Sequence, residues 1–165
     1  MTTADGNAHP RLPLDPDAPD AGTAPTERWR LIGAVAAGGF AGAALRDLAV
    51  EALPAAPDRL PWATLLVNLA GAFLLGVLME VVAERAPAGD PTARVLRHLA
   101  GVGLLGAFTT YSTFALETDL SLRAAAPLVA LGGGAAAVVL GMVAAAAGIA
   151  AGRRLPLPGA WREPG

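Results

Sequence analysis

Long apolar runs separated by short polar segments are the clearest pattern in this chain. No ionisable residue interrupts residues 60 to 79 or residues 124 to 152, and a helix needs about 20 apolar residues to cross the hydrocarbon core of a bilayer. Two further apolar runs cover about residues 29 to 53 and 98 to 117, and these carry charged residues inside or at their ends. The pattern predicts an all-α membrane protein with four transmembrane helices.

Tryptophan and proline mark several of the predicted span ends. Trp29 lies at the start of the first span between two arginines, and Pro61 and Trp62 open the second span. Tryptophan is enriched at membrane interfaces, and proline fits the first turn of a helix. Pro54 and Pro57 are expected to end the first span, because the residue before a proline disfavours the helical conformation.

The predicted domain is flanked by two tails. Residues 1 to 27 are rich in Pro, Asp, Ala and Thr and contain no apolar segment. Such a composition cannot bury enough surface to fold, so we predict a disordered tail rather than a signal peptide. We expect the four-helix transmembrane domain to occupy residues 28 to 155 and a C-terminal tail to occupy residues 156 to 165.

Composition supports the membrane assignment and narrows the function. Of the 165 residues, 54% are hydrophobic, and the mean hydropathy is +0.50. Four spans leave no room for a soluble catalytic domain. The sequence has no cysteine, no pair of histidines at metal-ligand spacing, no Ser-His-Asp set and no glycine-rich phosphate loop followed by lysine. We therefore expect a single small domain that is not an enzyme and that acts within the membrane.

Basic residues are distributed unevenly between the two ends of the predicted bundle. Eight arginines lie near the membrane on the side that both termini share, and three lie on the other side. The positive-inside rule then predicts that both termini lie in the cytoplasm. The eight are Arg28, Arg30, Arg85, Arg94, Arg97, Arg153, Arg154 and Arg162, and the three are Arg46, Arg59 and Arg123.

Polar side chains gather inside the third apolar run. Four hydroxyl residues and two aromatics occupy the six positions 109 to 114, which is not a lipid-facing composition. In a helix, Thr109, Ser112 and Thr113 would share one face, and Tyr111 and Phe114 would make a second face. The hydroxyls could simply bond to carbonyls one turn earlier while the aromatics pack. Four hydroxyls beside a Gly-Ala pair instead favour an ion pathway or a binding site.

One residue in each of the first two spans, Arg46 and Asn68, has two possible roles. Asn68 either joins helices through its amide or serves a pathway. Arg46 either extends its head group to the membrane surface or has a role in a vestibule or in helix pairing. The small residues at positions 38 to 43 offer a face on which another helix can pack closely.

The groups left in the middle of the membrane are neutral hydrogen-bond donors. Amide N–H groups, hydroxyls and the electropositive edges of aromatic rings can all point toward an anion. The carboxylates lie near span ends, at Asp47, Glu51, Glu84 and Glu117, so the chain lacks the deep carboxylate that a cation pump would use. A small hydrated anion could exchange its water for such donors, which favours passage over storage.

Three motifs resemble, in order and spacing, the Fluc (CrcB) fluoride channels of bacteria. These motifs are Gly39-Phe40-Ala41-Gly42-Ala43 with Arg46, the segment from Thr64 to Gly71 with Phe73 and Gly76, and the segment from Gly103 to Phe114 with Glu117. The resemblance covers about residues 29 to 152. The second and third motifs together are specific, whereas the glycines of the first would be weak alone.

The resemblance implies a fluoride-selective channel in the bacterial inner membrane that relieves fluoride toxicity by passive efflux. It implies an antiparallel, dual-topology dimer with two pores and a third helix broken near its middle. Asn68, Tyr111, Ser112, Thr113 and Phe114 would line the ion pathway. Arg46 and Glu117 would have vestibule or structural roles, and the backbone carbonyls of Gly106 and Thr109 would bind a structural Na+ at the dimer centre.

Three departures from the family pattern leave alternatives open. Tyr111 stands where the family usually has Phe, and the fourth span lacks polar residues that extend the pore in some members. The uneven arginine distribution suggests one preferred orientation, and hence a heterodimer with an oppositely oriented paralogue in place of a homodimer. The alternatives are a non-conducting or obligate heteromeric subunit, or a small dual-topology drug transporter. The transporter would need a carboxylate deep in its first helix, and Asp47 and Glu51 lie too near that helix's end.

Overall fold

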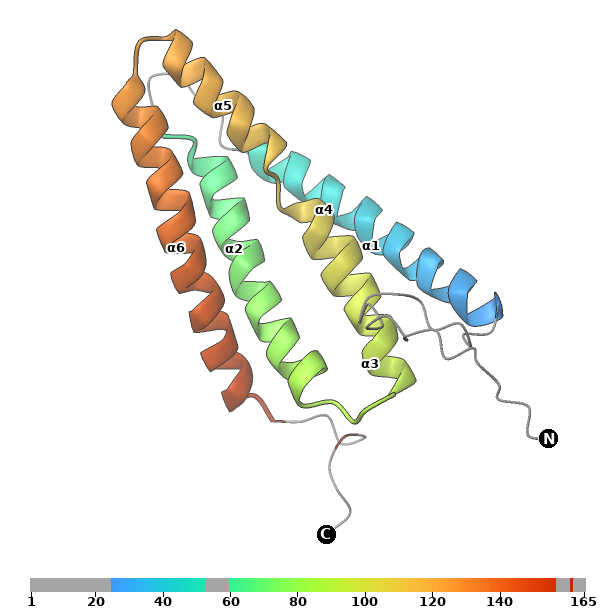
Figure 1. Cartoon of the computed structure of the whole chain (residues 1–165). Coiled ribbons are helices and arrows are strands. Elements are labelled where there is room, and N and C mark those ends of the chain that lie inside the picture. Colours follow the sequence, from blue (N-terminus) through green and yellow to red (C-terminus); the bar gives the residue numbers. More distant parts are fainter. Residues whose placement is uncertain (1–24, 53–59, 157–160, 162–165) are drawn as a thin grey trace, which may run out of the picture.

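Four long helices form the molecule in a computed structural model that describes residues 25–52, 60–156 and 161. All four are long and apolar enough to cross a membrane. The candidate spans are Pro25–Ala52, Trp62–Glu84, Pro91–Arg123 and Pro127–Arg154. The first span begins and the fourth ends at the same end of the bundle (Figure 1). The prediction of an all-α protein with four spans is therefore confirmed.

The spans comprise eight helical segments. The first span is α1 (Pro25–Ala52), and the second is α2 (Trp62–Leu78) followed by a π-helical turn, η1 (Met79–Glu84). The fourth is α6 (Pro127–Arg154). The third span contains α3 (Pro91–Leu96), the π-helical η2 (Arg97–Leu105), α4 (Gly106–Phe108) and α5 (Ser112–Arg123).

The predicted tails lie largely outside the described residues. The structure gives no description of residues 1–24, and α1 begins at Pro25, four residues before Trp29. Pro54, Pro57, Arg59 and Arg162 also lie outside the described residues. In the C-terminal segment, Trp161 is only 7% exposed and packs with Val82 and Ala93. A tryptophan from this segment therefore covers the junction between η1 and α3.

Glycines allow the helices to approach at backbone distance in two pairs. In α1, a Cβ atom on Gly38 would overlap the carbonyl oxygen of Leu99, and one on Gly42 would overlap that of Leu104. In α6, a Cβ atom on Gly148 would overlap the carbonyl oxygen of Phe73 in α2. The small-residue face expected on the first span thus packs against η2 of the same chain. Close packing through small residues is the usual way in which helices associate in lipid.

The helical path of the third span stops between α4 and α5. Thr109 has an extended backbone with φ −75° and ψ 152°, and α5 begins only at Ser112. Thr109 N–H still donates to the Leu105 carbonyl at 3.1 Å, which closes the last turn of the first part. In residues 109–111, backbone N–H and C=O groups therefore lack the partners that a continuous helix would supply, and they need other hydrogen-bond partners.

Candidate functional site

Asn68 in α2 supplies the partners for the backbone of Thr110. Its Nδ2–H donates to the Thr110 carbonyl at 3.0 Å, and its Oδ1 accepts from the Thr110 N–H at 2.9 Å. The opposite orientation of the amide would place two N–H groups against each other, so these two contacts fix the assignment of oxygen and nitrogen. One of the two amide hydrogens on Nδ2 remains free of this pair.

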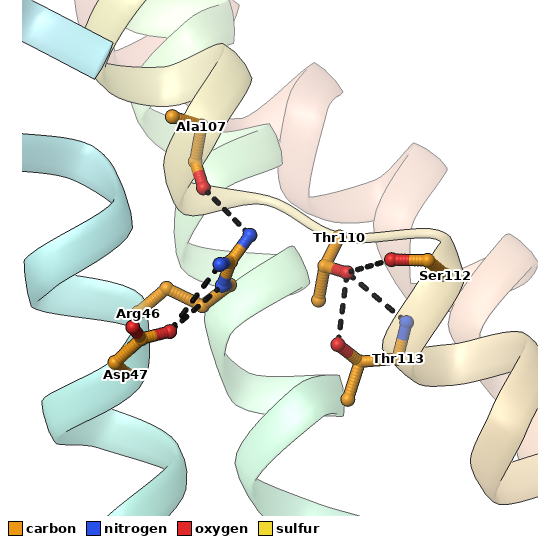
Figure 2. Close-up of polar contacts among 6 residues, drawn as sticks. All are labelled: Arg46, Asp47, Ala107, Thr110, Ser112 and Thr113. Atoms are coloured by element: carbon orange, nitrogen blue, oxygen red, sulfur yellow. Dashed lines mark hydrogen bonds and ion pairs between the residues drawn. The ribbon is translucent and has the colours of Figure 1, made fainter. Parts of the chain in front are cut away.

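The Thr110 hydroxyl organises the start of α5. Its Oγ1 donates to Thr113 Oγ1 at 3.0 Å and accepts from the Thr113 N–H at 3.2 Å. Ser112 Oγ lies 3.3 Å from the same oxygen (Figure 2). A side-chain oxygen that accepts from an N–H three residues later acts as a helix cap. The buried Thr110 therefore links Ser112 and Thr113 into one hydroxyl cluster.

A groove of about 500 Å³ lies beside this segment. Five of the nine site residues predicted from the sequence border this groove, whereas Arg46, Ser112, Thr113 and Glu117 do not. The side chain of Tyr111 is 82% exposed. The fourth span contributes only small or apolar groups to the groove. The lining residues are Asn68, Gly71, Ala72, Leu75, Leu105, Gly106, Thr109, Thr110, Tyr111, Phe114, Ala137, Val138 and Gly141.

The face expected from helical spacing does not form. Thr109 has an extended backbone and lies outside the helices, while Ser112 and Thr113 belong to α5. The single face that these three hydroxyls would share in a continuous helix is therefore absent, because the chain leaves the helical path between them. Thr109 instead bonds through Oγ1 to the Leu105 carbonyl at 2.9 Å, which is the ordinary back-bonding considered for these hydroxyls.

Arg46 reaches from α1 to the end of α4. Its Nη1 donates to the Ala107 carbonyl at 3.3 Å, and its Nη2 lies 3.3 Å from Asp47 Oδ1 (Figure 2). The last carbonyls of a helix lack intrahelical donors, and a cation is favourable there. Arg46 thus joins the first span to the third just before Thr109.

Glu117 is held by Thr64, which is not among the site residues predicted from the sequence. Thr64 Oγ1 donates to Glu117 Oε1 at 2.9 Å, and the Thr64 side chain is fully buried. Glu117 Oε2 is buried and has no hydrogen-bond partner among the described residues. Thr64 lies four residues before Asn68, a spacing that places both polar side chains on one helical face. That spacing was the available signal for Thr64.

The carbonyls of Gly106 and Thr109 have the chemistry that a structural sodium ion would need. Thr110 N–H, the usual donor to the Gly106 carbonyl, bonds to Asn68 instead. Among the backbone hydrogen bonds of the described turns, loops and helix ends, none reaches the carbonyl of Gly106 or Thr109. Carbonyl oxygens are hard ligands suited to small hard cations. The part of the chain that the structure describes contains no cluster of three or more His, Cys, Asp or Glu side chains that could hold a metal.

The family match and the individual relatives of this chain agree with one another. Residues 33–149 match the family described as CrcB-like protein, Camphor Resistance (CrcB). The chain is 44% identical over 120 residues to the Fluoride-specific ion channel FluC 2 of Nocardia farcinica (strain IFM 10152), covering 73% of this chain and 83% of the relative. It is 39% identical over 122 residues to the Fluoride-specific ion channel FluC of Caulobacter vibrioides (strain NA1000 / CB15N), covering 73% and 94%. Identity to the Fluoride-specific ion channel FluC 1 of Streptomyces coelicolor (strain ATCC BAA-471 / A3(2) / M145) is 38% over 118 residues, covering 62% and 74%.

Proposed function

The chain belongs to the CrcB family, and on that premise we propose that it is a fluoride-selective ion channel that lowers cytoplasmic fluoride by passive efflux. The observation that carries the proposal is the groove beside residues 109–111, which brings Asn68, Tyr111 and Phe114 together within the membrane-spanning part. These three residues come from two different spans, and each carries a neutral group that can face an anion. Relatives whose names state fluoride specificity support the choice of ion.

The proposed pathway uses donors that carry no formal charge. The free amide hydrogen of Asn68 and the electropositive ring edges of Tyr111 and Phe114 would replace part of the hydration shell of fluoride. The hydroxyls of Ser112 and Thr113 would continue the path at the start of α5. Neutral donors bind an anion without a fixed positive charge that would retain it, which suits conduction.

We further propose that two subunits pair in antiparallel orientation, with the third span acting as two half-helices on either side of residues 109–111. The available carbonyls of Gly106 and Thr109 from both subunits would then meet and could hold a structural sodium ion. Irregular backbone inside a membrane is tolerated where protein or an ion satisfies it. This arrangement would account for the carbonyls that lack backbone donors.

The channel would reside in the bacterial inner membrane with a preferred orientation. Of the arginines counted in the sequence analysis, seven on the side of the termini and two on the other side fall within the described helices and loops. Such an imbalance favours one orientation. Relatives carry the names FluC 1 and FluC 2, which is consistent with a heterodimer of oppositely oriented paralogues. A homodimer remains the simpler form of the proposal.

One observation favours a second candidate, a subunit that conducts only in a heteromer. The fourth span contributes only Ala137, Val138 and Gly141 to the groove. A partner subunit whose fourth span supplies hydroxyls at the corresponding positions would complete the proposed ion pathway. This candidate keeps the family and the ion and differs in requiring a second chain.

Ion efflux from liposomes that contain only this protein tests both candidates. We expect rapid loss of fluoride and little loss of chloride, and we expect the variants Phe114→Ile and Asn68→Ala to reduce fluoride efflux strongly. The matched control is Phe40→Ile, because Phe40 is 81% exposed and does not border the groove. Absence of efflux from a folded dimer would reject the self-sufficient channel, and recovery after addition of a paralogue would establish the heteromer.

A further inference from the structure

The backbone of Thr110 is satisfied by one side chain from a different span. Both its N–H and its C=O bond to Asn68, at 2.9 Å and 3.0 Å, across 42 positions in sequence. Thr110 itself is only 7% exposed, so water cannot readily serve these groups. A buried backbone group without a partner is costly, and more so where lipid surrounds the protein.

We propose that Asn68 is a positioning residue. It clamps the backbone at Thr110 and thereby sets the geometry of the non-helical segment, residues 109–111. A neutral amide offers an acceptor and a donor in the same plane without any change of protonation, which is what the N–H and C=O of one residue require. A hydroxyl or an apolar side chain at this position could not satisfy both groups. This inference deepens the proposed function, because the clamped segment carries Tyr111 and leads directly to Phe114.

The clamp acts together with a second contact on the other side of Thr109. Arg46 from α1 donates to the Ala107 carbonyl, while Asn68 from α2 holds Thr110. The extended residue Thr109 therefore lies between two fixed points that come from two different helices. The hydroxyl of Thr110 then caps α5 through the Thr113 N–H (Figure 2). A shift of Asn68 would move the start of α5 and the aromatic rings with it.

The clamp also limits what Asn68 can offer to an anion. Its Oδ1 accepts from the backbone and one Nδ2 hydrogen donates to the backbone, so a single hydrogen is left. A role as anion ligand alone would leave the Thr110 backbone independent of this side chain. The two roles therefore differ in a measurable way, namely in the protection of the Thr110 amide hydrogen from exchange.

Amide exchange on protein labelled with ¹⁵N-threonine tests the clamp in the full-length chain. In Asn68→Leu, which keeps the number of side-chain heavy atoms and removes both hydrogen bonds, we expect the Thr110 amide to exchange at least about tenfold faster than in the wild type. In Asn68→Asp, the carboxyl oxygen can still accept from the Thr110 N–H, so protection should stay close to wild type. The Thr118 amide lies within α5 and serves as the internal control for global unfolding.

Each outcome separates the clamp from the channel proposal. Faster exchange at Thr110 in Asn68→Leu, with Thr118 unchanged and Asn68→Asp protected, supports the clamp. Equal Thr110 protection in wild type and Asn68→Leu overturns it, even when wild-type liposomes release fluoride. Loss of protection in Asn68→Asp to the same extent as in Asn68→Leu also overturns it. If the wild type does not conduct fluoride, the channel proposal is rejected. The exchange result at Thr110 then still decides whether the clamp exists.

Discussion

The substitution Gly42→Ala tests whether the first span must touch the third at backbone distance. Gly42 lies in α1, and a Cβ atom there would overlap the carbonyl oxygen of Leu104 and lie 3.0 Å from the backbone nitrogen of Phe108. Both neighbours are backbone atoms just before the non-helical segment. They cannot rotate away as a side chain would, so α1 must move back from η2 and α4.

Two energetic effects of opposite sign determine the result. Alanine is favoured over glycine in a helix by up to about 1 kcal/mol. Overpacking of a close contact costs about 1–3 kcal/mol, and rigid backbone neighbours place Gly42 at the upper end. We therefore expect a net loss of about 2 kcal/mol in the free energy of unfolding, which corresponds to a fall in Tm of about 4–8 °C for a protein of this size.

Thermal unfolding of the purified protein in detergent, followed by circular dichroism, measures this change. Gly33→Ala is the matched control, because it lies in the same helix and a Cβ atom there would have no neighbour within 4 Å. We expect this control to unfold at or slightly above the wild-type temperature. A Gly42→Ala protein that unfolds as late as the control would show that the close approach of α1 is not required.

Three other predictions concern contacts away from this interface. Thr64→Val removes the donor to Glu117 without changing the side-chain shape, so we expect a loss of about 1–3 kcal/mol in unfolding free energy; unfolding identical to that of the exposed control Thr92→Val would contradict it. Trp161→Ala should lower the unfolding free energy by about 3 kcal/mol because a packed indole is lost, and an unchanged Tm would show that the indole does not pack in solution. If the carbonyls of Gly106 and Thr109 hold sodium, replacing Na+ with N-methyl-glucamine should lower the Tm of the dimer through loss of ligand binding. Equal Tm values in the two salts would reject the sodium site.

The four spans were predictable because the length of an apolar run decides whether a helix can cross a bilayer. Residues 62 to 79 of the first uninterrupted run fall inside the span Trp62–Glu84, and residues 127 to 152 of the second fall inside the span Pro127–Arg154. The family resemblance read from three motifs is also confirmed by the match over residues 33–149. The glycines of the first span were recognised as a packing face. Their partner within the chain, η2, was not predictable because it depends on how the third span lies against the first.

The detailed geometry of the candidate site depended on long-range contacts. Helical periodicity placed Thr109 on the same face as Ser112, but the chain leaves the helix between them, at the point where Asn68 bonds to the Thr110 backbone. The spacing of Thr64 to Asn68 indicated a shared polar face, but the hydrogen bonds of Thr64 to Glu117 and of the Thr110 backbone to Asn68 join different spans and could not be predicted from spacing within one helix. The pathway roles of Tyr111, Ser112, Thr113 and Phe114 stay predictions.

The most direct test of the central claim is an electrical recording from the purified protein in a planar bilayer. With a fluoride gradient across the membrane, we expect a current that reverses at the fluoride equilibrium potential and disappears when chloride replaces fluoride. A current carried equally by chloride, or no current from a folded dimer with or without a paralogue, would contradict the claim that this chain forms a fluoride-selective pathway.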